Sequence, residues 1–520
     1  MSDLYLVELT FLPLVAAVVV AFLPRFKVEL MRQVAIGASL LIFAFSAPLA
    51  SYNGTGLEHV CKKGWIESLG ISLHMGVDGI SVLLILLTTL TTPVVLLSSL
   101  SHIKERIKEF LVLALAMETG MIGVFATLDL VLFYVFWEVT LIPLYFIVGI
   151  WGGPRRLYAA FKFFVYTMAG SLPMLVAILY LVVGVGDGLG QPTADLTVLL
   201  KRSLTATEQT WLFLAFALAF AIKVPMFPFH TWLPDAHVEA PTGGSVVLAG
   251  VLLKMGTYGF VRFVIPMFPD AARQFQPLML TLAVIGIVYG AFLAWAQTDI
   301  KKLIAYSSIS HLGFVMLGLF AFTGRGLAGG VLQMVNHGLS TGALFLLAGM
   351  IYDRRHVREM HCFGGIARRM PVFAFFLGFV TLSSIGLPGL NGFVGEFLIL
   401  LGTFEVARWY AIIGALGVLL GAIYMLGMVK RVLFGPITHK ENESLTDLNR
   451  REVACLVPLC VFIVVIGIFP GPFLKIMEPN IKKVSDKVAA VTVVEKTPRL
   501  AALTEDLPGA ERLAEGGSPR

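Results

Sequence analysis

Ionisable side chains inside apolar stretches are the residues of this sequence most able to do chemistry. Glu138 lies in the middle of F-Y-V-F-W-E-V-T-L-I-P-L-Y, and no other formal charge occurs between Asp129 and Arg155. On insertion scales an ionisable group at the centre of a bilayer costs about 2.5–3.5 kcal/mol, so such a group needs a partner and is usually functional. We therefore expect Glu138 either to meet a cation from another helix or to be protonated.

Two lysines lie in comparable surroundings. Lys223 comes just before Pro225, and Lys254 lies in L-A-G-V-L-L-K-M-G between Gly250 and Gly256. Backbone carbonyls and water at a helix break could hold the Lys223 ammonium, and a lysine that can lose its proton there can act in a relay. The two glycines allow a neighbouring helix to approach Lys254 closely, which would also suit a purely structural lysine.

The remaining candidates follow in chain order. Glu396 ends a second interrupted stretch, and His311 and His337 lie between Lys254 and Glu396 in the sequence. Histidine titrates near neutral pH and can pass protons, although a neutral imidazole bonded between two helices would explain either histidine equally well. Glu118 in A-M-E-T-G is a secondary candidate. Together these groups predict a proton relay through the middle of a helix bundle.

Composition indicates the elements that must position these groups. Of the 520 residues 57% are hydrophobic and 14% are charged, whereas a soluble protein carries about 25% charge. Apolar stretches near the ~20 residues that cross a bilayer recur along the chain without the strict alternation of a barrel strand. We expect an all-α membrane protein with about fourteen transmembrane helices. The expected spans are Leu6–Leu23, Val34–Ala50, Ile80–Leu100, Phe110–Leu128, Leu130–Ile150, Ala160–Val183, Trp211–Trp232, Gly244–Val264, Leu278–Trp295, Ile300–Phe320, Gly326–Ile351, Pro371–Leu401, Tyr410–Leu433 and Val453–Phe473.

Two of these spans, the seventh and the twelfth, are interrupted by helix breakers. The first reads A-I-K-V-P-M-F-P-F-H-T-W-L-P from Ala221, and the second reads S-S-I-G-L-P-G-L-N-G-F-V-G-E-F from Ser383. Proline and glycine are common in membrane helices, but both interruptions lie within a few residues of a buried charge. Each is the fourth span in a run of five, spans 4–8 and spans 9–13, and an odd number of spans inverts the second copy. This arrangement predicts two inverted five-helix repeats.

The predicted organisation follows from these repeats. It comprises an N-terminal three-helix region (1–109), a first inverted repeat (110–266), a second inverted repeat (267–434), a C-terminal helix (435–480) and a polar, mobile tail (481–520). The first span has no cleavage site and is expected to be an anchor rather than a signal peptide.

Charge and cysteine patterns exclude several functions and give an orientation. Lysine and arginine concentrate in the loops after odd-numbered spans, so those loops should be cytoplasmic and both termini periplasmic. The formal charge of +6 is explained by this topology and does not indicate nucleic acid binding. The four cysteines form no Cys-x-x-Cys pair, and no phosphate loop or Gly-x-Gly-x-x-Gly fingerprint occurs, so we expect no metal or nucleotide cofactor in this chain.

Several long motifs resemble the antiporter-like membrane subunits of NADH:quinone oxidoreductase, respiratory complex I. The resemblance covers the chain to about Phe473. Its motifs are L-H-M-G-V-D-G-I-S from Leu73, F-W-E-V-T-L-I-P-L-Y from Phe136, K-V-P-M-F-P-F-H-T-W-L-P-D-A-H from Lys223, A-P-T-G-G-S-V-V-L-A-G-V-L-L-K-M-G from Ala240 and D-I-K-K-L-I-A-Y-S-S-I-S-H from Asp299.

This resemblance implies a role for each candidate. Glu138 and Lys223 would be the ion pair of one half-channel, Lys254 the connecting lysine, and His311 and His337 the links. Glu396 would be the terminal residue of the second half-channel. A glutamate at this position resembles the subunit M (mitochondrial subunit 4) family, whereas the sister subunits L and N carry lysine. The absence of an extra C-terminal span agrees, since subunit L continues into a lateral helix.

The resemblance further implies a non-redox subunit of a proton-translocating enzyme complex. FMN, iron–sulfur clusters and quinone would be held by partner subunits. The expected neighbours are subunits of the L and N types, the amphipathic lateral helix of subunit L, and lipids. The expected location is the bacterial inner membrane, or the mitochondrial inner membrane for an organellar protein. Two alternatives stay open, a sodium/proton antiporter subunit of the Mrp type and a structural scaffold.

Overall fold

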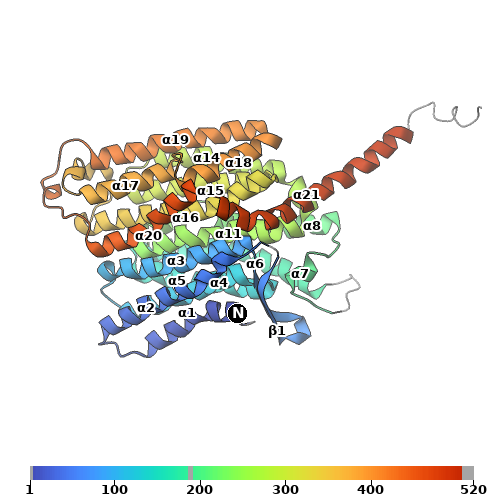
Figure 1. The fold of residues 1–520 in the computed structure, drawn as a ribbon, viewed down its shortest axis with the longest axis horizontal. Coiled ribbons are helices and arrows are strands. Elements are labelled where there is room, and N and C mark those ends of the chain that lie inside the picture. The colour runs from blue at the N-terminus through green and yellow to red at the C-terminus, as the bar shows by residue number, and fades with distance from the viewer. Residues whose placement is uncertain (1–3, 55, 185–190, 506–520) are drawn as a thin grey trace, which may run out of the picture.

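The computed structural model describes residues 4–54, 56–184 and 191–505, with side chains to residue 490, and it is a bundle of long helices (Figure 1). Twelve helices of the described residues are long and apolar enough to cross a membrane. Eleven of these contain α1 (Tyr5–Phe22), α2 (Val28–Ser46), α3 (Gly79–His102), α4 (Ile107–Ala126), α5 (Leu130–Trp151), α6 (Arg156–Val183), α14 (Gln276–Trp295), α15 (Ile300–Phe320), α16 (Gly324–Arg355), α19 (Arg408–Leu433) and α20 (Arg450–Ile468), and the twelfth is the helical segment Thr242–Met267. Helix α8 (Ala206–Lys223) is a further long helix. The short helices α7 (Leu196–Leu199) and α13 (Pro269–Gln274) lie in connections.

Both predicted helix breaks are confirmed. Helix α8 ends at Lys223 and α9 (Trp232–Glu239) begins nine residues further on, while α17 (Pro371–Ser384) is separated from α18 (Asn391–Val406). Proline removes a backbone donor, and Gly386 and Gly389 in the second break have positive φ angles of 75° and 93°, which favour glycine. The exact count of fourteen spans and the inverted repeat stay predictions.

The helix that carries Lys254 is irregular in a way that the sequence did not indicate. It runs through α10 (Thr242–Val247), a π-helical turn at Leu248–Leu252, α11 (Leu253–Gly259), a second π-helical turn at Phe260–Val264 and α12 (Ile265–Met267). A π turn holds one residue more than an α turn and often marks a functional site. Lys254 follows the first of these turns directly.

The expected all-α class is confirmed, and the structure adds one short hairpin that the sequence did not predict. Strands β1 (Glu58–Ile66) and β2 (Ile71–Val77) form an antiparallel hairpin between α2 and α3. Along β1 only Cys61 is buried, so the strand lacks the alternation of buried and exposed residues that would have predicted it. Lys62 and His74 of the hairpin contact the Asp195 carboxylate at 2.6 and 3.4 Å, and this attaches the hairpin to the loop before α7.

The predicted start of a separate tail at residue 481 does not match the helices of the described residues. Helix α21 extends over Gly471–Glu505, so the predicted boundary at 480/481 falls inside it. Met477, Ile481, Val484 and Val488 are buried at spacings of one helical turn, and the helix contacts α3 and α16 before its end projects beyond the bundle (Figure 1). An apolar stripe in a polar sequence explains why composition alone suggested a tail. Residues 506–520 lie outside the described residues.

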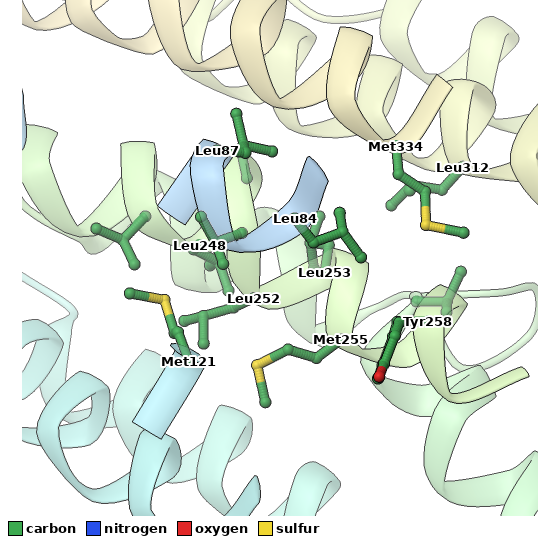
Figure 2. Packing of buried hydrophobic residues seen from close by; sticks show 14 of the residues in the cluster. Leu84, Leu87, Met121, Leu248, Leu252, Leu253, Met255, Tyr258, Leu312 and Met334 are labelled. Carbon is green, nitrogen blue, oxygen red and sulfur yellow. The ribbon is translucent and has the colours of Figure 1, made fainter. Parts of the chain in front are cut away.

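The centre of the bundle is formed by α3, α15, α16 and the segment Thr242–Met267. Figure 2 shows Leu84 and Leu87 of α3 beside Leu248 and Leu252, with Leu312 and Met334 at the opposite side of the view. The apolar window of α16 and that of Thr242–Met267 are entirely buried, whereas 39% of the α19 window is buried. Lys254, His311 and His337 therefore lie on the most enclosed helices.

Candidate functional site

Four of the predicted residues form a continuous line of contacts across the bundle. Lys254 Nζ lies 2.7 Å from His337 Nδ1. The ring centroids of His337 and His311 are 5.7 Å apart, and His311 Nδ1 lies 2.9 Å from Glu396 Oε1. The residues come from α11, α16, α15 and α18 and are at most 7% exposed. The line joins the helix with the π turns to the second broken helix.

The carboxylate of Glu396 has a further partner that the sequence analysis did not identify. Gln333 Nε2 donates a hydrogen bond to Glu396 Oε1 at 3.2 Å. The second nitrogen of His311 lies 3.3 Å from Ser384 Oγ, at the end of α17. Since Gln333 is neutral, a search for charged residues in apolar spans could not detect it. Its position one helical turn before His337 is the only signal in the sequence.

The π turn supplies a partner for Lys254. Its Nζ donates to the carbonyl of Ala249, five residues earlier and within the π turn. The predicted close approach at the flanking glycines is confirmed, because a Cβ at Gly256 would meet Val224 and Phe220 of the first broken helix. On the other side, a Cβ at Gly338 of α16 would overlap the Gly250 carbonyl. Lys254 is thus held between both neighbouring segments.

Lys223 and Glu138 are near one another but do not touch. Lys223 is 1% exposed at the end of α8, with Nζ 5.0 Å from the centroid of the Trp137 ring. It is within electrostatic reach of Glu138. Glu138 Oε1 is buried without a hydrogen-bond partner among the described residues. No ion pair within 4 Å joins these two described side chains, so the implied pair is separated in this structure.

Glu118 stands apart from the line. It is fully buried on α4 and faces Thr92 of α3. Among the described residues, no hydrogen bond or ion pair connects it to Glu138, Lys223 or Lys254. Its secondary rank is consistent with this position.

A buried histidine that the sequence analysis did not single out lies beside the line. His237 of α9 is fully buried, and neither ring nitrogen has a hydrogen-bond partner among the described residues. Its ring stacks on Phe345 of α16, with centroids 4.4 Å apart and planes at 10°. It is in electrostatic contact with Lys254, Lys301 and His337. A buried polar ring without partners requires an explanation such as bound water.

The fold and the site define a class, a multi-pass membrane protein with ionisable residues in line across broken helices. The chain belongs to the family described as NADH:quinone oxidoreductase/Mrp antiporter membrane proteins, whose profile matches residues 127–423. Within this family it belongs with the subunit M and chain 4 group. It is 46% identical to NADH-quinone oxidoreductase subunit M of Rhodobacter capsulatus, over 91% of this chain and 94% of that protein. It is 42% identical to NADH-ubiquinone oxidoreductase chain 4 of Marchantia polymorpha, over 91% and 95%.

Solved structures agree with membership of this family. A chain of respiratory complex I from Thermus thermophilus superposes with a TM-score of 0.85 at 35% identity, covering 93% of this chain and 99% of that one. A chain of the Mrp complex from Dietzia sp. superposes with a TM-score of 0.82 at 20% identity, covering 95% and 100%. The second likeness demonstrates a shared fold alone.

Proposed function

We propose that this chain is a proton-translocating subunit of the membrane arm of complex I, with Glu138, Lys223, Lys254, His311, His337 and Glu396 as its relay. The observation that carries the proposal is the unbroken line of contacts from Lys254 through His337 and His311 to Glu396. Supporting it is the similarity over nine-tenths of the chain to proteins named subunit M.

The geometry supports a stepwise transfer. A proton on Lys254 Nζ has His337 Nδ1 within hydrogen-bond distance, and one on His311 Nδ1 has the Glu396 carboxylate. The two imidazoles are in ring contact but no hydrogen bond joins them in the described structure, and a cavity of about 10 Å³ is lined by His311, His337, Ser340 and Ser384. Such a polar cavity has room for about one water molecule, which can carry the proton between the rings.

The separated pair at Glu138 and Lys223 would be the control point. In the proposed cycle, quinone chemistry in partner subunits moves these two side chains together or apart. An approaching carboxylate stabilises the charged lysine, and a departing one favours release of its proton toward Lys254. The chain would thus contribute proton transfer, while FMN, iron–sulfur clusters and quinone act in the partners.

We further infer the surroundings from the resemblance. The neighbours would be subunits of the L and N types with the lateral helix of subunit L, in a bacterial or mitochondrial inner membrane with both termini on the outer side. The Mrp-type antiporter is the second candidate, favoured only by the shared fold at 20% identity.

The test uses the complete complex in native membranes. Lys254→Met, Lys223→Ala and Glu138→Ala should each leave assembly intact and reduce proton translocation by about tenfold or more, since a positioned proton carrier typically contributes a factor of 10²–10⁴. A scaffold would keep translocating at the wild-type rate in all three variants. An antiporter of the Mrp type would exchange sodium for protons in vesicles without NADH, and complex I would not.

A further inference from the structure

A row of residues on α16 runs from the relay to a surface of the protein. His337, Thr341, Phe345, Gly349 and Asp353 follow one another at intervals of four residues, so each side chain lies beside the next. At 3.6 residues per turn and a rise of 1.5 Å per residue, the row winds about 160° around the helix while it rises about 24 Å along the axis. His337 at one end contacts Lys254, and Asp353 at the other end is partly exposed.

The exposed end of this row holds a titratable pair and a polar cavity. His102 Nδ1 of α3 lies 2.5 Å from Asp353 Oδ1, with 15% and 24% of the two side chains exposed. Ser101 Oγ lies 3.4 Å from the other oxygen of Asp353. Helices α3, α16 and α20 meet here (Figure 1) around a cavity of about 10 Å³ lined by Ser98, Ser101, His102, Thr242, Asp353 and Glu452. This is room for about one water molecule among polar partners.

The middle of the row is occupied by His237. Its ring stacks on Phe345, between Thr341, which lines the cavity at the relay, and Met350, which lines the cavity at Asp353. Thr242 brings the segment after His237 into contact with the same row, because a Cβ at Gly349 would overlap the Thr242 side chain. A fully buried imidazole, without a hydrogen-bond partner among the described residues, therefore packs on α16 between the residues that line the two water-sized polar cavities.

We propose that this row is the uptake route by which protons reach the relay: the His102–Asp353 pair collects a proton at the surface, and His237 passes it to His337 and Lys254. The inference rests on the proposed function and adds where its protons come from. It places uptake on the side that the lysine and arginine distribution predicts to be cytoplasmic.

Each step conserves protons and needs no further reactant. His102 or Asp353 accepts a proton from bulk water and gives it to the water of the cavity. His237 accepts it on one ring nitrogen and releases the proton of the other toward His337. Lys254, Lys301 and His337 face His237 electrostatically, so a charged Lys254 repels a proton arriving on His237. Transfer is therefore favoured when Lys254 is neutral and can be reloaded.

The test measures NADH oxidation, assembly and proton translocation in inside-out membrane vesicles containing the whole complex. The variants are Asp353→Asn, His237→Gln and Thr242→Val, with Asp353→Glu as the conservative replacement. Thr242→Val keeps the shape of the side chain and removes only the hydroxyl that lines the cavity. Matched controls are Glu441→Gln and His361→Gln, on the same side of the protein, and Thr381→Val, which replaces a buried threonine that lines neither cavity.

We expect protons translocated per NADH oxidised to fall several-fold in the three variants, to recover in Asp353→Glu and to stay at the wild-type value in the controls. Wild-type translocation per assembled complex in both His237→Gln and Thr242→Val would overturn the uptake route. If Lys254→Met abolishes translocation in the same membranes, the relay stands and only the route fails. If Lys254→Met also translocates normally, the proposed function itself fails.

Discussion

The partners of Glu396 determine how its carboxylate can exchange a proton. His311 and Gln333 both approach the same oxygen, Oε1, at 2.9 and 3.2 Å. Asn336, one residue before His337, donates to the Asn391 carbonyl at 2.8 Å and so connects α16 to the start of α18. Gln333 therefore acts on the position of Glu396 rather than as a proton carrier, because an amide does not titrate.

We predict that Gln333→Leu weakens translocation without preventing assembly. A hydrogen bond to a charged group contributes about 1.5–3 kcal/mol, so its loss should slow translocation by roughly tenfold. The measurement is NADH-driven acidification of inside-out vesicles. Gln297→Leu is the control, since Gln297 bonds only to a nearby carbonyl at the end of α14. Equal translocation by both variants would show that Glu396 does not depend on Gln333.

Among single residues, the sequence identified the charged site residues better than the neutral side chains around them. Glu138, Lys223, Lys254 and Glu396 could be found because a charge in an apolar span is costly and conspicuous. Gln333 could not, since a neutral amide carries little of that cost, and His237 was missed because it lies between the expected spans Trp211–Trp232 and Gly244–Val264. The separation of Glu138 from Lys223 also depends on side-chain packing around Trp137, which no local sequence pattern encodes.

Among the helices, the π turn before Lys254 has the most direct link to the site. The turn at Leu248–Leu252 holds one residue more than an α turn would, and its Ala249 carbonyl accepts a hydrogen bond from Lys254. A carbonyl oxygen has two lone pairs, so it can accept from a side chain in addition to the backbone. Ala249 is five residues before Lys254, and its carbonyl is thus a partner for a buried ammonium at the end of the π turn.

Deleting Val251 should convert this turn to a regular α turn while the flanking segments keep their positions. Lys254 would lose its carbonyl partner, and we expect translocation to fall several-fold while assembly is kept. The control is deletion of Val261, which regularises the second π turn at Phe260–Val264 and contains no relay residue. The π turn has no role at Lys254 if the two deletions translocate equally.

The hairpin is attached by a carboxylate with a shifted pKa. Burial alone would raise the pKa of Asp195, but the close contact with His74 and the hydrogen bonds from Lys62 and Thr197 outweigh it and hold the pKa well below its usual range. A lowered folded-state pKa stabilises the contact above the unfolded pKa of about 3.9, and the contribution is lost as pH falls toward the folded value. We expect the hairpin to stay attached at pH 7 and pH 5.

This prediction can be followed by hydrogen exchange of backbone amides in residues 58–77. Exchange should be slow at pH 7 and 5 after correction for the intrinsic rate and should rise only well below pH 4. Asp195→Asn should loosen the hairpin at neutral pH by about 1.5–3 kcal/mol, the usual contribution of charged hydrogen bonds. Glu67→Gln, on the exposed turn of the hairpin, should leave exchange unchanged. The same exchange in both variants would exclude Asp195 as the attachment.

Helices could be predicted where the local sequence determines their extent or their ends. Proline and glycine set both helix breaks, and long apolar stretches set the spans. The hairpin was not predicted because its first strand lacks an alternating pattern of buried and exposed residues. The full length of α21 was not predicted because only four of its described apolar residues are buried, in a sequence that is otherwise polar. The π turns depend on the fit between three segments, since they bring Gly250 toward Gly338 and Gly256 toward Val224.

For the molecule as a whole, α21 joins parts of the bundle that are far apart in the sequence. It contacts α3 near the beginning of the chain and α16, whose first turns line a cavity together with α21. Its backbone passes so close to Gly79, the first residue of α3, that a Cβ there would overlap the Ile476 carbonyl. Lys487 of the same helix donates to the Leu200 carbonyl at 2.6 Å. Helix α21 therefore packs against segments of the bundle that are distant from it in the sequence.

We predict that Gly79→Ala displaces α21 and lowers the stability of the assembled protein by about 1–3 kcal/mol, the usual cost of forcing an atom into a filled space. The displaced helix should be cut by a protease faster than in the wild type, with a lower melting temperature in detergent. Gly378→Ala is the control, since a Cβ at Gly378 meets no atom within 4 Å. An unchanged cleavage rate at α21 would contradict the predicted packing of α21 against Gly79.

The hydrogen bond between Lys254 and His337 has a consequence for how the relay can be observed. An ammonium only donates, so a charged Lys254 requires a bare Nδ1 on His337, whereas a neutral amine can accept from a protonated Nδ1. A proton on His337 Nδ1 that is donated to Lys254 therefore marks the lysine as neutral. Histidine labelled with ¹⁵N would give different ring-nitrogen signals in the two cases, so one buried imidazole can serve as a spectroscopic indicator of the proton's position during turnover.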